Sequence, residues 1–137
     1  MYRCLLLCDA GVTPSDLLLK FIRRTGCLDL VWAGAYPDLA AAGLPAAGWD
    51  LVFASLPAPE QPVPEAWQEL LRRQPALVLT SPYPARLYAG HDWQPLAFLA
   101  EPFSFDQFQR ALQRYFDSGL APEHPAGAAV ARQQPGT

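Results

Sequence analysis

Short apolar runs alternate along the chain with segments whose apolar residues recur at helical spacing. Five runs of four to six mostly apolar residues are typical of buried strands, at residues 3–8, 28–33, 51–54, 76–79 and 96–100. Segments with a helical pattern separate them. This alternation predicts a parallel sheet joined by right-handed crossovers, a doubly wound five-stranded α/β domain with helices on both faces.

The segment between the first two strands predicts a helix with a defined start and end. Thr13 can accept hydrogen bonds from first-turn amides, Pro14 has the φ angle suited to the first helical position, and Asp16 complements the positive helix terminus. Gly26 ends the pattern. Further helical segments are expected at residues 37–42 and 65–73, with at most one or two turns at residues 85–89.

The last helix has the most complete start signal. Ser104 and Gln107 have the spacing of a capping box, in which each side chain bonds the backbone N–H of the other residue. Phe103 and Phe108 occupy the two positions of a hydrophobic staple. The apolar face then continues until Gly119.

The composition indicates one globular domain followed by a tail. Apolar residues make up 51% of the 137 residues, which is enough for one sizeable core. Residues 120–137 consist mainly of Ala, Pro, Gly and Gln and offer little apolar area to offset the entropy of ordering. We therefore expect one domain over residues 1–119 and a disordered tail over residues 120–137.

The charge pattern argues against nucleic acid and membrane as partners. Charged residues make up 17% of the chain, the formal net charge is -3, and the basic residues are scattered rather than gathered into the basic surface that phosphate binding needs. No apolar stretch approaches the ~20 residues needed to cross a bilayer, and the N-terminus lacks a signal pattern. A cytoplasmic location is the resulting expectation.

The three cysteines fit a reduced protein core. Cys4 and Cys8 lie four residues apart on the first predicted strand, and a strand rises ~3.3 Å per residue, so their sulfurs are too far apart for a disulfide or a shared metal. Cys27 leaves the count odd. We expect core thiols and no metal site.

Polar residues follow the predicted strands at the edge where doubly wound domains place their functional crevice. Asp9, Ser55, Ser81 and Glu101 each stand at a strand end or just beyond it. Because the carboxyl ends of parallel strands meet at one edge of the sheet, these four side chains are expected to lie near one another.

An enzyme or a small ligand-binding domain of flavodoxin-like fold is the alternative for this crevice. The loop after the first strand contains one glycine, Gly11, where a nucleotide-binding loop needs several. A hydrolase triad would need a histidine base, and neither His91 nor His124 is placed by any motif. We therefore expect no catalytic residue and no cofactor.

Three stretches resemble receiver domains of bacterial response regulators, most closely those of the LytTR class. They are Trp-Asp-Leu-Val-Phe-Ala-Ser at residues 49–55, Thr-Ser-Pro-Tyr-Pro at 80–84, and Phe-Leu-Ala-Glu-Pro-Phe-Ser-Phe-Asp-Gln-Phe at 98–108. The likeness covers about residues 2–119 and is most specific after the fifth strand. It implies a CheY-like, flavodoxin-like fold with strand order 2-1-3-4-5.

The resemblance also implies that the phosphorylation chemistry of the family is lost. A working receiver holds Mg²⁺ with an acidic pair, accepts phosphate on an aspartate, and uses a hydroxyl and a lysine to stabilise the phosphoryl group. Carried over by position, the acidic pair falls on Cys8 and Asp9, the acceptor on Ser55, the hydroxyl on Ser81 and the lysine on Glu101. A thiol, a neutral hydroxyl and a reversed charge imply a pseudo-receiver that binds no metal and is not phosphorylated in this way.

The family likeness further predicts a cis peptide bond before Pro102 and a protein partner. The expected contact face comprises the fourth helix, the fifth strand and the fifth helix, and would bind a signalling protein or a second copy of the chain. Arg86, Tyr88, Trp93 and Tyr115 are its expected exposed residues. Trp93 has an equally weighted alternative, in which its ring covers the sheet edge.

Two further hypotheses stay open. One is that the chain is the remnant of a regulator that lost an output domain after Gly119; the tail contains no DNA-binding pattern, which argues against direct control of transcription. A separate Ser/Thr kinase could modify Ser55, although a hydroxyl that is hydrogen-bonded locally is the simpler interpretation.

Overall fold

The computed structural model describes residues 2–8, 16–35 and 48–121. Their centre is a five-stranded parallel sheet with strand order β2-β1-β3-β4-β5, as expected. The strands are β1 (Tyr2–Cys8), β2 (Leu28–Ala35), β3 (Leu51–Ser55), β4 (Leu77–Ser81) and β5 (Ala97–Ala100). The helices are α1 (Asp16–Arg24), α3 (Glu65–Arg72) and α4 (Phe105–Asp117), with a 3₁₀ turn, η1 (Ala85–Tyr88).

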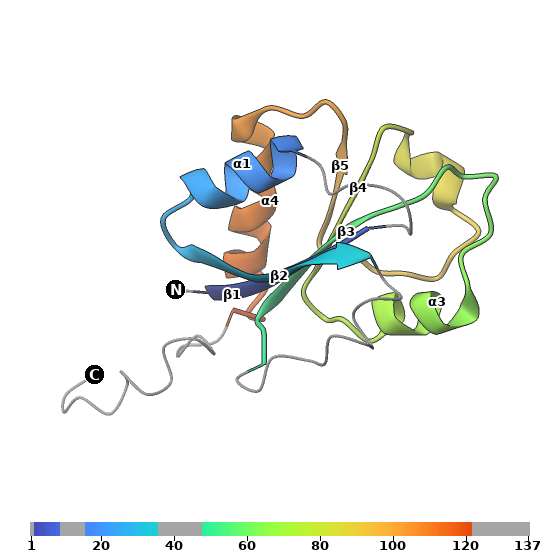
Figure 1. The fold of residues 1–137 in the computed structure, drawn as a ribbon, viewed down its shortest axis with the longest axis horizontal. Helices are drawn as coiled ribbons and strands as arrows, with labels where there is room; N and C mark the ends of the chain where they lie inside the picture. The colour runs from blue at the N-terminus through green and yellow to red at the C-terminus, as the bar shows by residue number, and fades with distance from the viewer. Residues whose placement is uncertain (1, 9–15, 36–47, 122–137) are drawn as a thin grey trace.

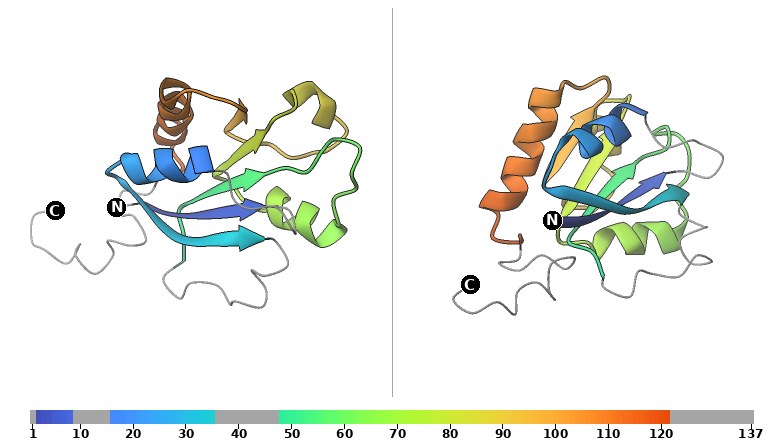
Figure 2. Two further views of the ribbon diagram at one scale, coloured as in Figure 1. Left: turned by 45° about the horizontal axis from the view of Figure 1, so that its top comes forward. Right: turned by 60° about the vertical axis from the view of Figure 1, so that its left-hand side comes forward.

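Helical elements cover both faces of this sheet. Helices α1 and α4 lie on one face, and α3 and η1 on the other (Figures 1 and 2). Successive side chains of each strand point to opposite faces of the sheet. In β1, Cys4 and Leu6 pack toward α1 and α4, whereas Leu5 and Leu7 pack toward α3 and η1. Two apolar layers therefore enclose the sheet, as a doubly wound α/β domain requires.

Helix α4 begins as the sequence predicts. The Ser104 Oγ accepts from the Gln107 backbone N–H at 3.0 Å, and the Gln107 Oε1 accepts from the Ser104 N–H at 2.8 Å, so the capping box is confirmed. The rings of Phe103 and Phe108 both contact Phe21 of α1, with ring centroids 5.8 Å apart in each case. These aromatic contacts fix α4 against α1.

Several boundaries differ from the expected ones, and one difference matters for the site. Strand β4 was expected over residues 76–79 but extends through Ser81, so Thr80 and Ser81 belong to the strand and point to opposite faces. The helix start at Thr13 and Pro14, the helix over residues 37–42, and residues 122–137 of the expected tail lie outside the described residues. None of the described helices is long and apolar enough to cross a bilayer.

Candidate functional site

The carboxyl ends of the strands bring most of the expected site positions to one edge. Leu7 pairs with Ala54, so Cys8 and Ser55 occupy the next position on two adjacent strands. Ser81 pairs with Ala100 of β5, and the Glu101 N–H donates to the Ser81 carbonyl at 2.8 Å. The fifth expected position, Asp9, lies outside the described residues.

The side chain that contacts Ser55 is Thr80 rather than Ser81. Ser55 and Thr80 are paired across β3 and β4, and their hydroxyl oxygens lie 3.1 Å apart. Both face the α1 and α4 side, because Phe53 and Val78, two residues earlier, pack in that layer. Thr80 was missed because β4 was expected to end before it.

The position that the resemblance assigns to the acceptor, Ser55, is therefore paired with a second neutral hydroxyl, that of Thr80. Thr80 is fully buried, Ser55 is half-buried, and Cys8 on the adjacent strand is buried. Among the described residues, neither hydroxyl is hydrogen-bonded to a carboxylate or an imidazole that would act as a base. A serine without such a base is a poor nucleophile.

Ser81 takes part in a directed chain of hydrogen bonds on the other face. The Tyr83 N–H donates to the Ser81 Oγ at 3.0 Å, and the Tyr88 hydroxyl donates to the Pro57 carbonyl at 2.7 Å. The Ser81 Oγ and the Tyr88 oxygen lie 2.7 Å apart. Since the one proton of Tyr88 is used toward Pro57, Ser81 must be the donor to Tyr88.

This chain ties together two connections that leave the same sheet edge. Pro57 follows β3, whereas Tyr88 belongs to η1 after β4, and both residues are buried. Burial raises the pKa of Tyr88 above its ordinary value, so the hydroxyl stays protonated and keeps donating to Pro57. Ser81 points to the face of β4 opposite that of Thr80, so its hydroxyl lies away from Ser55.

Glu101, which the resemblance places at the lysine position, follows β5 and is half-buried. The peptide bond between Glu101 and Pro102 is cis, which confirms that prediction. Within the described ranges, no group of three or more His, Cys, Asp or Glu side chains is arranged to hold a metal ion.

Three residues expected to be exposed at the contact face are buried. Tyr115 is 0% exposed because it lies seven residues after Phe108 and continues the apolar stripe of α4. Tyr88 is 7% exposed beneath η1, and Trp93 is 9% exposed with its ring stacked on His91 at 4.0 Å between centroids. These three expectations of exposure were wrong, and the alternative in which Trp93 covers the sheet agrees with its burial.

Other residues of the connection after β4 are exposed. Arg86 is exposed, as expected, and Leu87 and Tyr83 are 48% and 39% exposed. Their exposure on an irregular connection could not be read from periodicity, because η1 is a single turn.

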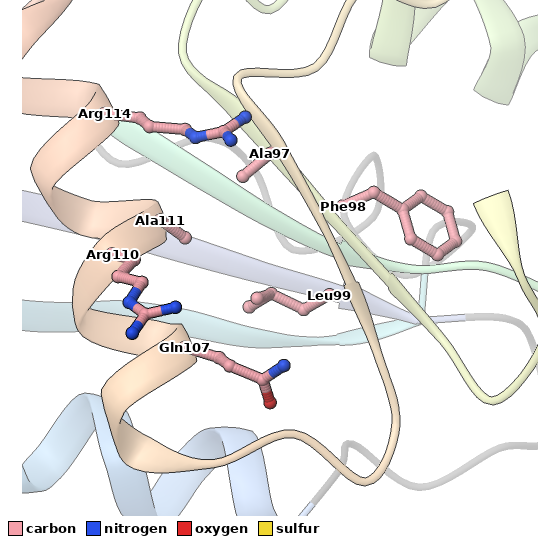
Figure 3. A pocket seen from close by; sticks show the side chains of 7 residues that line it. All are labelled: Ala97, Phe98, Leu99, Gln107, Arg110, Ala111 and Arg114. Carbon is pink, nitrogen blue, oxygen red and sulfur yellow. The ribbon is translucent and has the colours of Figure 1, made fainter.

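A groove of about 180 Å³ separates β5 from α4. Its floor is apolar and comes from both elements, while polar side chains of α4 form one wall (Figure 3). Arg110 and Arg114 extend from successive turns of the helix toward β5, and Phe98 points away from α4 to the opposite side of the strand. The two arginines were missed, although their spacing of four residues on the polar face of a predicted helix was a usable signal.

Comparison with known proteins adds no relative. No protein-family model matches the chain, and no curated protein sequence is similar to it.

Proposed function

We propose that this chain is a receiver-like protein-interaction domain of a signalling pathway, and that it works without aspartyl phosphate. The observation that carries the proposal is the bonded pair of neutral hydroxyls, Ser55 and Thr80, at the carboxyl edge of the sheet. The strand order and the two helical layers are consistent with a flavodoxin-like fold of the receiver kind.

The chemistry of the edge supports the loss of phosphoryl transfer. A phosphoacceptor must be an anionic nucleophile whose developing charge is neutralised by a metal and a lysine. Here the acceptor position is Ser55, the neighbouring strand ends in the thiol-bearing Cys8, and the lysine position carries the acidic Glu101. Each of the three changes removes a different requirement of the reaction.

The hydrogen bonds around Ser81 support an interaction surface that does not depend on a switch. A switch would need a hydroxyl able to move toward the phosphoryl group, followed by a change in the connection after β4. Ser81, the position that the resemblance gives to this hydroxyl, instead bonds Tyr88, which bonds Pro57, so these bonds link the two connections. The hydroxyl that contacts Ser55 belongs to Thr80. A binding face built on the two connections would be permanently formed.

The test is a thermal melt and light scattering of the full chain with and without Mg²⁺ and beryllofluoride, which mimics an acyl phosphate on an aspartate. The wild-type chain is expected to keep its melting temperature and its mass in both conditions. A matched variant carries Cys8→Asp, Ser55→Asp and Glu101→Lys, which restores the three changed positions. This variant is expected to gain a Mg²⁺-dependent response to beryllofluoride.

The two proteins can contradict the proposal separately. A shift in the wild-type melt would show that the edge still binds the phosphoryl mimic. A restored variant that folds, by circular dichroism, yet ignores Mg²⁺ and beryllofluoride would refute the assignment of these positions to a receiver site.

A further inference from the structure

Strand β5 is an edge of the described sheet and leaves backbone groups without a strand partner. In a parallel ladder, residues bond the two sides of a strand alternately. The Leu96 N–H donates to Leu77 on the β4 side at 2.7 Å, so the backbone groups of Phe98 point the same way. Those of Ala97 and Leu99 therefore point outward, to the open edge.

This edge lacks the features that discourage pairing at the opposite one. Strand β5 contains no charge and no proline, only Ala-Phe-Leu-Ala. At the opposite edge, the register of β2 shifts against β1 between Cys4 and Leu5, and the strand carries Asp29. Irregularity and charge protect strand edges from added strands.

Depressions lie on both sides of β5. The groove toward α4 is about 180 Å³, and a second depression of about 200 Å³ lies toward η1. The second is mainly apolar and aromatic, with Tyr88, Trp93 and Phe98 in its lining. A strand added to β5 would place successive side chains alternately into the two depressions.

The α4 side selects acidic residues. Arg114 has no ion pair with any described residue, and its guanidinium makes only a 3.4 Å bond to the Leu96 carbonyl. Arg110 pairs with Asp106 at 3.0 Å on an exposed surface, where such a pair is weak. A carboxylate reaching either guanidinium would gain a charge-assisted hydrogen bond.

The spacing of the arginines matches an extended chain. Four residues along a helix advance about 6.0 Å, at ~1.5 Å each. Two residues along a strand advance about 6.6 Å, at ~3.3 Å each. Carboxylates on alternate residues of an added strand would thus meet Arg110 and Arg114 in turn.

From these observations we infer that β5 binds an extended segment of a partner protein in which acidic and apolar residues alternate. The acidic side chains contact Arg110 and Arg114, and the apolar side chains enter the depression beside Phe98. The inference rests on the proposed function and names the chemistry of its partner.

The test measures binding of a fluorescein-labelled eight-residue peptide of alternating Asp and Val to the full chain by fluorescence anisotropy. A peptide of the same composition, with four Asp followed by four Val, is the control ligand. Only the alternating peptide is expected to bind. Arg110→Glu with Arg114→Glu should weaken binding at least about tenfold, whereas Lys20→Glu with Arg23→Glu on exposed positions of α1 should leave it unchanged.

Backbone pairing is tested without altering the protein. Two further alternating peptides carry N-methyl groups, one on every Asp and the other on every Val. Only one set of N–H groups can face β5, so methylation of one set should abolish binding and methylation of the other should preserve it.

The inference would be overturned by equal binding of the peptide with four Asp followed by four Val, by binding that tolerates both methylation patterns, or by unchanged binding to the double Arg variant. If the wild-type chain is a dimer and the double Arg variant is a monomer, a second copy of the chain is the occupant of β5, and the choice of partner is overturned. A chain that ignores beryllofluoride and does not bind the alternating peptide would refute this inference and leave the proposed function in place.

Discussion

Two buried tyrosines should respond in opposite directions to the same chemical change, the loss of the hydroxyl group. Tyr88 donates to Pro57 and accepts from Ser81, both at 2.7 Å. Tyr115 is 0% exposed, and its hydroxyl has no hydrogen-bond partner in the described part of the chain. Replacing each by Phe removes one oxygen and nearly nothing else.

The expected magnitudes follow from which polar groups are left behind. Tyr88→Phe removes two hydrogen bonds, each worth about 1 kcal/mol net, and leaves a buried carbonyl and a buried hydroxyl proton without partners. We expect the free energy of unfolding to fall by about 2–4 kcal/mol. Tyr115→Phe removes a hydroxyl buried without a bond, and we expect a gain of about 1 kcal/mol.

Urea unfolding at neutral pH, followed by circular dichroism, measures both changes. The midpoint should move with unchanged slope, because neither variant alters the area exposed on unfolding. Tyr83→Phe is the matched control, since Tyr83 is 39% exposed and should change stability by less than about 0.5 kcal/mol. The double variant Tyr88→Phe with Ser81→Ala should cost about 1 kcal/mol less than the sum of the single variants, because the bond is already broken in either one.

If Tyr88→Phe lowers the free energy of unfolding no more than Tyr83→Phe does, the hydrogen-bond chain does not form in solution. Destabilisation by Tyr115→Phe of more than about 1 kcal/mol would mean that its hydroxyl has a partner, and the reasoning about that residue would fail.

Three further changes test the core and the last helix. Burial raises the pKa of the Cys4 thiol from 9.0 to about 12, so the contribution of the protonated thiol to the free energy of unfolding is complete below pH 9. Between pH 9 and pH 12 this contribution is lost at up to about 1.4 kcal/mol per pH unit. Cys4→Ala should flatten this pH dependence of the free energy of unfolding, measured by urea unfolding, and an unchanged pH dependence would contradict the prediction. Ser104→Ala should lower the free energy of unfolding by about 1 kcal/mol, because it removes the acceptor of the Gln107 N–H, whereas Ser104→Asp should change it by less than about 0.5 kcal/mol. Equal losses of stability in the two variants would argue against the cap. Phe108→Ala should lower the free energy of unfolding by about 3–5 kcal/mol in the same assay, because the buried ring stacks on Phe53 with 5.7 Å between the ring centroids. A loss below about 1 kcal/mol would show that this contact is not maintained.

The sheet and the last helix could be predicted because their signals are local. Each strand is a short apolar run, and the segments after the first and the fifth strands contain residues that start and stop a helix. The capping box of α4 uses only residues 104–107, so its geometry follows from four consecutive positions.

The errors arose where burial depends on residues distant in sequence. Tyr88 is buried because η1 folds back and its hydroxyl reaches Pro57, 31 residues earlier, and no local pattern indicates this contact. Tyr115 is different, since the helical stripe from Phe108 already predicted its burial, and its assignment to an exposed face overlooked that period. A two-residue error at the end of β4 hid Thr80, because adjacent strand residues face opposite layers.

Tyr88 connects the edge of the sheet to the surface proposed for binding. Its hydroxyl is fixed by Ser81 and Pro57, while its ring lines the depression beside β5 and lies 5.9 Å from the ring of Phe98. One buried position of the side chain serves both roles, so the wall of the depression stays formed as long as the hydrogen-bond chain does. A permanently formed wall favours binding without a prior conformational cost, which is the behaviour required of an interaction domain that does not await phosphate.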